Sequence, residues 1–418
     1  MAEKLVAASV PAPSYAGGLG RLEVVAWRNA LFVVFAVCGI SMASWAARLP
    51  TVRDVLLATS AQMGLLLVAI SAGSIAGLLV SSHVIARLGA RRTIAVAFLV
   101  GPAGYAAAGV GVALAGFQTI FVGLAVFGLA FSVCDVAMNL QGAANERVLR
   151  RTIMPVYHAF FSLGTVAGAG LGALLEALAV PVVTHIVVIA VVMVIVVQRA
   201  VRALRSEHLV DAGASAAPDA APPADHGGWR ERLAIWREPA TILIGLIVLG
   251  TAFAEGSAGD WLALSAVDGH GLDNEGGAVV YGVFVAAMTL GRLGGVLVLD
   301  RFGRVPALRV SAALAVLGLG VYVFVPDVVI AGIGVVLWGL GAALGFPVGM
   351  SAAADDPRRA AARVSAVATI GYVAFLIGPP LIGFLGERLG LLLALLPVLA
   401  LVAVSGLASP AARERRRD

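Results

Sequence analysis

Charged residues are scarce in this sequence. Of its 418 residues, 13% are charged and 60% are hydrophobic, and the mean hydropathy is +0.98. An ordinary globular domain is about 25% charged, so too few charges are present to cover the surface of a water-soluble protein of this length. The apolar content equally excludes an intrinsically disordered chain. The composition therefore predicts a membrane protein.

Cysteine and the motifs of cofactor chemistry are also rare or missing. Cys38 and Cys134 are the two cysteines, and both fall inside apolar runs, which argues against a disulfide framework or a thiolate metal site. No HExxH, GxSxG or GxxxxGK[ST] pattern occurs, so we expect no enzyme, no ATP-driven pump, no metal and no cofactor. Residues 1–27 hold no apolar h-region, so no signal peptide is predicted.

Long apolar runs are what the sequence does contain. A bilayer core needs about 20 apolar residues per helix, and twelve stretches meet this length. Isolated prolines and glycines inside them do not exclude helices, because neighbouring helices satisfy the backbone groups that are freed. The predicted spans are 28–47, 61–84, 93–115, 118–140, 157–179, 181–198, 240–264, 278–299, 306–325, 328–350, 364–386 and 390–408.

The basic residues set the predicted orientation. If residues 1–27 are cytoplasmic, the inner loops and the two ends carry 25 of the 29 basic residues. The outer connections hold only Arg48, Arg53 and Arg388, and Arg292 lies within a span. Because positive loops stay on the cytoplasmic side, we expect both termini in the cytoplasm. This clustering also argues against a nucleic-acid-binding face.

The longest polar stretch divides the spans into six plus six. Its centre is rich in alanine and proline, which is typical of a linker. Trp229, Leu233 and Trp236 share one helical face beyond that centre, which predicts either a short helix on the membrane surface or a plain solvated connector. The predicted layout is a tail at 1–27, a bundle at 28–198, a linker at 199–239, a second bundle at 240–408 and a tail at 409–418.

The two halves share a short basic loop at corresponding places. Gly89 lies between the second and third spans, and Gly303 lies 214 residues later between the eighth and ninth. The same offset relates Gly77 to Gly291. A constant offset of this kind indicates two parallel six-helix repeats.

These loops resemble the G-x-x-x-D-R-x-G-R-R loop of the major facilitator superfamily of secondary transporters. The resemblance covers about residues 28–408. It implies an all-α integral membrane protein whose twelve transmembrane helices form two pseudo-symmetric six-helix bundles. It also implies that the loops form a conformational latch. The matching latch residues are Arg87, Gly89, Arg91 and Arg92 in the first copy, and Asp300, Arg301, Gly303 and Arg304 in the second.

The sequence departs from the family pattern in informative places. Ser82, Ala86 and Ala90 replace the glycine, the acid and one base in the first loop, so the N-terminal half must close by other contacts. The fourth-span arginine motif of drug exporters and the fifth-span glycine-proline motif of antiporters are both missing. The stretches 135–142 and 255–261, and His158 with residues 162–164, resemble a poorly characterised bacterial branch related to sugar and fucose permeases.

Ionisable residues inside the bilayer are candidate functional residues, because each costs several kcal/mol to place there. Asp135 lies well inside the fourth span, Asn139 follows one turn later, and His158 begins the fifth span. An Asp135–His158 contact would give a proton-coupled carrier a titratable pair. The alternative is that Asp135 is a fixed hydrogen-bond acceptor between helices.

The seventh and eighth spans carry a second group of such residues. Glu255 follows a long apolar run, and Gly256 and Gly259 are expected to let the helix unwind beside it. The alternative is that Glu255 marks the end of the helix, with Asp260 already solvated. Arg292 is expected to bind an anionic substrate group, to pair with a carboxylate or to extend to the inner face.

Aromatic residues complete the predicted site. The resemblance places Tyr281, Trp338 and Tyr372 on cavity-lining spans, where they would stack on a substrate or simply pack. Together these residues predict a transmembrane transporter of a small organic solute that works by alternating access and is coupled to protons. The alternative is a drug/proton antiporter for multidrug efflux. We expect a monomer in the inner (plasma) membrane, with the solute, protons and lipid as partners and no nucleic acid.

Overall fold

The computed structural model describes residues 19–151, 153–205, 235–356 and 359–414. Within these residues the chain is α-helical and contains no strand. Twelve helices are long and apolar enough to cross a membrane. The predicted class of an all-α membrane protein with twelve spans is therefore confirmed.

The N-terminal half contains six of the spans and one short extra helix. The sixth span ends in a 3₁₀ turn. The elements are α1 (Arg21–Ala46), α2 (Leu49–Leu56), α3 (Ser60–Leu88), α4 (Ala90–Ala113), α5 (Phe117–Leu149), α6 (Met154–Ala177), α7 (Val182–Ala200) and η2 (Val201–Ala203).

The C-terminal half contains the other six spans, two of which are interrupted. Proline has no backbone N–H and its ring collides with the carbonyl four residues earlier. Pro347 lies four residues after Ala343, where the tenth span is interrupted. Pro397 lies four residues after Leu393 and two after the break at Leu395. The elements are α10 (Pro239–His270), α11 (Asn274–Phe302), α12 (Arg304–Phe324), α13 (Val328–Ala342), α14 (Gly345–Ala353), α15 (Ala360–Leu389), α16 (Leu391–Ala394), α17 (Leu396–Ala408) and η3 (Ser409–Ala412).

Two details differ from the sequence prediction. The helix α2 was not expected, because eight residues are too few to give a span signal. The expectation that α10 unwinds at Gly256 and Gly259 is wrong, since α10 is continuous from Pro239 to His270. Glu255 therefore lies in the middle of a helix and not at its end. Most of the predicted surface helix near Trp229 lies outside the described residues.

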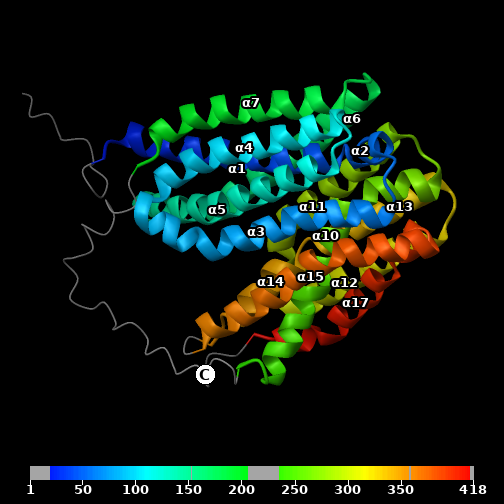
Figure 1. Ribbon diagram of the computed structural model, residues 1–418. Helices are drawn as coiled ribbons and strands as arrows, with labels where there is room; N and C mark the ends of the chain where they lie inside the picture. Colours follow the sequence, from blue (N-terminus) through cyan, green and yellow to red (C-terminus); the bar gives the residue numbers. More distant parts are fainter. Residues whose placement is uncertain (1–18, 152, 206–234, 357–358, 415–418) are drawn as a thin grey trace, which may run out of the picture.

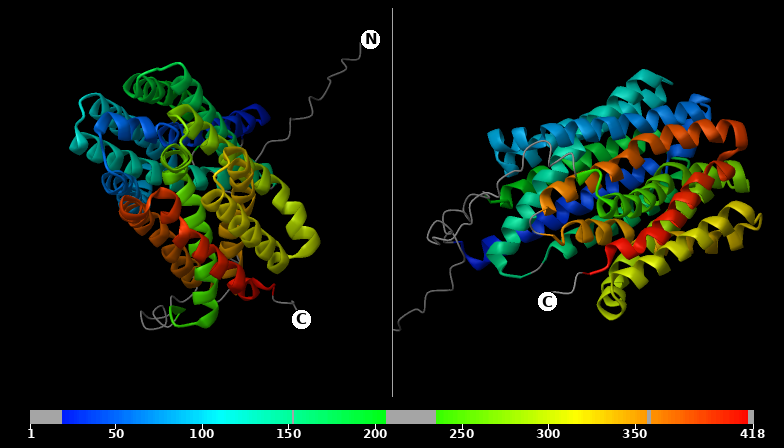
Figure 2. Two further views of the ribbon diagram at one scale, coloured as in Figure 1. Left: turned by 90° about the vertical axis from the view of Figure 1, so that its right-hand side faces the viewer. Right: turned by 90° about the horizontal axis from the view of Figure 1, so that it is seen from below.

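The helices form two groups that lie against each other. In Figure 1 the blue-to-green N-terminal half lies above the green-to-red C-terminal half, and Figure 2 shows the same two groups from two further directions. Within the first group α5 packs on α3 and α4, and α1 packs on α6. Within the second, α12 packs on α13 and α10 packs on α15. Between the groups, α3 faces α15 and α6 faces α11.

The two halves repeat their local geometry. Gly89 joins α3 to α4 with φ 74° and ψ 153°, and Gly303 joins α11 to α12 with φ 77° and ψ 174°. A positive φ with an extended ψ is essentially restricted to glycine. The predicted correspondence of the two loops therefore extends to their backbone conformation.

Glycines also let helices cross at backbone contact. A Cβ atom added to Gly123 of α5 would lie 2.6 Å from the carbonyl oxygen of Gly104 on α4. In the second half, a Cβ on Gly334 of α13 would lie 2.7 Å from the carbonyl oxygen of Gly318 on α12. Such close approach stabilises helix pairs in lipid, where no hydrophobic force drives helices together.

Gly123→Val is expected to destabilise the protein because the new side chain would overlap the α4 backbone. Overpacking of this kind costs about 1–3 kcal/mol, so the thermal unfolding midpoint of the purified protein in detergent should fall by several degrees. Gly170→Val is the matched control, since nothing lies within 4 Å of a Cβ at that position on α6. Equal midpoints for the two variants would contradict this reading of the crossing.

Candidate functional site

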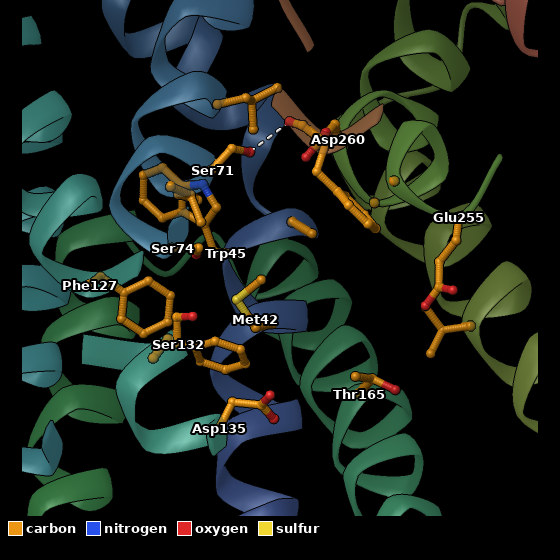
Figure 3. Close-up of a pocket in the computed structure, with 18 of the residues that line it drawn as sticks. Met42, Trp45, Ser71, Ser74, Phe127, Ser132, Asp135, Thr165, Glu255 and Asp260 are labelled. Carbon is orange, nitrogen blue, oxygen red and sulfur yellow. Dashed lines mark hydrogen bonds between the residues drawn. The ribbon is translucent and has the colours of Figure 1, made fainter. Parts of the chain in front are cut away.

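A cavity of about 340 Å³ lies between the two bundles. Its walls come from α1, α3, α5 and α6 on one side and from α10, α11 and α15 on the other, with Leu49 of α2 closing one part. Figure 3 shows Asp135 apart from Glu255 and Asp260, which project from the other bundle. The cavity is therefore bounded by both halves of the repeat.

Six of the nine predicted site residues line this cavity. Three do not. Asn139 lies one turn beyond Asp135 on α5, Trp338 is fully buried against Phe284 on the far side of the wall, and His158 lies at the exposed start of α6. The six lining residues are Asp135, Glu255, Asp260, Tyr281, Arg292 and Tyr372.

Glu255 and Arg292 form an ion pair across two neighbouring helices. An Nη2 hydrogen of Arg292 on α11 is donated to Oε1 of Glu255 on α10 at 2.7 Å. Both side chains remain about 30% exposed, so the pair faces the cavity and is not sealed in the bundle. Of the three expectations for Arg292, the structure shows pairing with a carboxylate.

Asp135 has a hydrogen-bond partner on its own helix. The Asn139 side-chain amide donates to the Asp135 carboxylate at 3.2 Å and to its backbone carbonyl at 2.8 Å. The expected Asp135–His158 contact is not seen, since the His158 ring instead meets the edge of Phe35 at 5.3 Å between ring centres. No arginine or histidine among the described residues pairs with Asp135.

Asp260 and Tyr281 lie on adjacent helices of the C-terminal bundle and have no bonded partner in the part of the chain that the structure describes. The Tyr281 side chain is 7% exposed and lines the cavity. It is close enough to Asp260 and Glu255 to interact with both charges. Their free hydrogen-bonding groups therefore face the cavity.

Aromatic rings make up much of the cavity wall. Sequence reasoning missed most of them, because an aromatic residue in an apolar span gives the same signal whether it faces lipid, core or cavity. Trp45 and Phe284 are almost fully buried, whereas Tyr372 is exposed to the cavity. The lining aromatic residues are Trp45, Phe127, Phe131, Phe161, Tyr281, Phe284, Tyr372 and Phe375.

The short helix α2 bridges the bundles at one end of the cavity. Arg53 forms an ion pair with Asp268 near the end of α10, and Asp54 accepts a hydrogen bond from Asn274 of α11 at 2.8 Å. Beside α2, the Thr59 hydroxyl donates to Glu387 of α15 at 3.2 Å. We call this set of contacts the α2 bridge.

The helix α2 and the residues beside it are held to the N-terminal bundle by further contacts. The Thr51 hydroxyl donates to Glu176 of α6 at 2.7 Å. Arg48, which is 1% exposed, pairs with the same carboxylate at 2.9 Å and donates to the carbonyl of Val180 at 2.6 Å. The helix α2 therefore belongs to the N-terminal bundle, and the α2 bridge is its set of contacts with the C-terminal bundle.

At the opposite end the bundles lie apart (Figure 1). A further hydrogen bond between the bundles, from Ser71 to the carbonyl of Phe375, lies within the cavity wall. Two predicted latch residues are bonded within their own halves, since Arg91 donates to the Val201 carbonyl and Arg304 pairs with Asp355. Among the described residues, the hydrogen bonds and ion pairs that join the two bundles therefore lie at the α2 bridge and in the cavity wall, and none lies at the end where α1 begins.

The N-terminal end of α10 is also held within its own bundle. Glu238, the residue that precedes α10, accepts hydrogen bonds from Arg359 and Arg363 at the start of α15. The hydrogen bond from the Arg363 guanidinium holds the pKa of Glu238 below its ordinary value. These ion pairs tie two cavity-lining helices together at their ends.

Two six-helix bundles of membrane-spanning length that enclose a cavity lined by ionisable side chains are typical of a membrane carrier of small molecules. A family model described as Major Facilitator Superfamily matches residues 30–379, and the chain belongs to that family. In the described residues, no group of three or more His, Cys, Asp or Glu side chains is placed to hold a metal ion.

Relatives and solved structures agree with this assignment. The uncharacterised transporter y4wD of Sinorhizobium fredii is 30% identical over 402 residues, which cover 91% of this chain and 98% of the relative. An uncharacterised MFS-type transporter of Yersinia pestis is 29% identical over 356 residues, which cover 85% and 88%. A crystal structure of a mutant of the nucleoside transporter NupG has a TM-score of 0.73 at 13% identity, covering 93% of this chain and 99% of that chain.

The Glu255–Arg292 pair is expected to show energetic coupling. Glu255→Gln and Arg292→Gln should each lower the unfolding midpoint, because each leaves one charge unpaired, and the double variant should lose less than the sum. A coupling energy of about 1 kcal/mol is expected for a partly exposed pair. Strict additivity in a thermal double-mutant cycle would show that the two side chains do not interact.

Proposed function

We propose that this protein is a secondary carrier that moves a small organic solute across the inner membrane by alternating access. The observation that supports this proposal is the cavity, which both bundles line with ionisable side chains and which polar contacts between the bundles bridge at one end. A carrier of this kind needs a site near the middle of the membrane that two rocking bundles expose to each side in turn. One chain encloses the whole cavity, which supports a monomer as the working unit.

The proposed orientation follows from the basic residues. Both termini and the linker at 199–239, which we take to join bundles 28–198 and 240–408, lie on the arginine-rich side. Under the positive-inside rule that side is the cytoplasm. The structure then represents an inward-open state, and the α2 bridge closes the outer end.

The outward-open state would exchange these contacts. The α2 bridge would open, and the basic loops at Gly89 and Gly303 would approach each other at the inner end. We propose that the latch then forms from residues of these two loops. Asp300 and Arg301 are exposed in the inward-open state and are available for such contacts.

We propose proton coupling through the carboxylates of the cavity. Protonation of Glu255 would remove the charge that holds Arg292, and protonation of Asp135 would remove a charge that has no cationic partner among the described residues. Asn139 and Tyr372 face Asp135, and Arg292 and Tyr281 face Glu255. Each protonation therefore changes the charge at the interface between the bundles.

A drug/proton antiporter is the second candidate function. The aromatic wall favours it, because flat apolar surfaces accept ligands of varied shape. The two functions differ in the breadth of ligands that stabilise the protein. A carrier of one solute class would respond to a narrow set of related compounds.

Spin labels on Leu178 and Val329 test the cycle. Both residues are exposed at the outer ends of different bundles, with exposed fractions of 63% and 74%. We expect two distance populations in reconstituted protein, with a ratio that changes by about fivefold or more between acidic and neutral pH, equivalent to about 1 kcal/mol. Asp135→Asn and Glu255→Gln should each reduce that pH response.

The outcomes separate the parts of the proposal. A single distance at every pH would exclude alternating access under these conditions. Two populations with a pH response that neither substitution changes would place the coupling protons elsewhere. Glu275→Gln is the control, because this exposed acid on α11 lies outside the cavity.

A further inference from the structure

The charges of the cavity do not balance. Three carboxylates and one guanidinium line it, and no histidine does. The guanidinium of Arg292 is already bound to Glu255 at 2.7 Å. Asp135 and Asp260 are left without a cation among the described residues. An anionic solute would have to displace Glu255 from Arg292, whereas a cation would meet carboxylates that are free.

Asp260 differs from Asp135 in having no hydrogen bond at all among the described residues. Asp135 has the Asn139 amide, but the Asp260 carboxylate has no donor. The Tyr281 side chain beside it is 7% exposed, and its hydroxyl is equally without a partner in the described chain. Asp260 is partly buried, and both groups line the cavity, so their polar atoms are accessible to a molecule that enters it. Two such groups that share one cavity wall indicate that a ligand supplies the missing partner.

The position of Asp260 places such a ligand at the closed end of the cavity. Asp260 is eight residues from Asp268 along α10, or about 12 Å at 1.5 Å per residue. Asp268 belongs to the α2 bridge, and Leu49 at the start of α2 lines the cavity. A ligand at Asp260 therefore lies directly inside the contacts that close the outer end.

The aromatic rings of the cavity wall suit a positively charged ligand. Trp45, Tyr281 and Phe284 line the cavity together with Asp260. The faces of aromatic rings attract cations, and the attraction grows when water is excluded. A free carboxylate, a tyrosine hydroxyl and aromatic faces together form a site of negative potential.

We infer that Asp260 and Tyr281 bind the amino group of a cationic organic solute, so that the transported substrate class is an organic amine. This inference rests on the proposed transport function and specifies its substrate. The protonated amine donates a hydrogen bond to the Asp260 carboxylate and another to the Tyr281 hydroxyl oxygen. The remainder of the solute occupies the aromatic part of the cavity toward Asp135.

Two matched compound series test the inference with the purified full-length protein. One series is glucosamine, glucose and glucuronate, and the other is 2-phenylethylamine, 2-phenylethanol and phenylacetate. Each series keeps the size nearly constant and changes the charge from positive to neutral to negative. The measurement is the shift in unfolding midpoint against concentration, since ligand binding stabilises the native state by mass action.

We expect the amine of at least one series to bind more tightly than its neutral and anionic counterparts. Asp260→Asn should weaken that binding by about 10- to 100-fold, because a charge-assisted hydrogen bond is lost. Tyr281→Phe should weaken it by about threefold to tenfold. Glu275→Gln, an equal charge change on the exposed start of α11, should leave it unchanged.

Opposite outcomes overturn the inference. Tightest binding of an anion or a neutral compound, no stabilisation by either amine, or undiminished amine binding in Asp260→Asn would each contradict it. The unliganded midpoints of the variants show whether they fold. Binding is measured without transport. Absence of amine binding would therefore not affect the spin-label test of alternating access, and absence of alternating access would not affect the result of the binding test.

Discussion

The cost of placing charge in a hydrocarbon layer governs this structure. An unpaired ionised side chain in the bilayer costs several kcal/mol, so each charge within the spans must be paired, face water or change its protonation. Within the spans, Arg292 is paired with Glu255 at the cavity, and just beyond the first span the buried Arg48 is paired with Glu176 of α6. The cavity exists as a polar site because Asp135 and Asp260 face it and not the lipid.

Close packing within each bundle allows the two bundles to move as rigid bodies on either side of that site. Glycines such as Gly104 and Gly123 bring helix backbones into contact within a half. Between the halves, contacts concentrate at the α2 bridge and along α3–α15 and α6–α11. Close packing within each half and few polar contacts between the halves allow the two halves to rock against each other. The helix α2 has no counterpart in the described part of the C-terminal half, so the α2 bridge makes the two ends of the molecule different.

Much of the fold could be predicted from the sequence, because apolar length and glycine position are local signals. The twelve spans and the equivalence of the Gly89 and Gly303 loops followed directly from them. The helix α2 was missed because eight residues cannot span a bilayer, and the unwinding of α10 at Gly256 was wrongly predicted. Glycine permits a break but does not impose one when the backbone hydrogen bonds can continue.

The candidate site was only partly predictable. Charged residues are rare inside the predicted spans, and this rarity alone was enough to identify Asp135, Glu255, Asp260 and Arg292 as candidates. The pairing of Glu255 with Arg292, 37 residues apart, and the absence of an Asp135–His158 contact depend on how helices rotate against each other. That rotation is set by packing across the bundle, and no single span encodes it.

The central proposal is a cavity with ionisable side chains between two bundles, which we propose opens toward the cytoplasm. A cysteine at Ser132, which lines the cavity from α5, tests it most directly in a background where Cys38 and Cys134 are replaced by alanine. Labelling with a membrane-impermeant maleimide is compared in inverted and right-side-out vesicles, with Leu22→Cys and Leu178→Cys as exposed markers of the inner and outer faces. The account predicts that without solute Ser132→Cys reacts in inverted vesicles like the inner marker. Reaction only from the outer face, or from neither face, would contradict it.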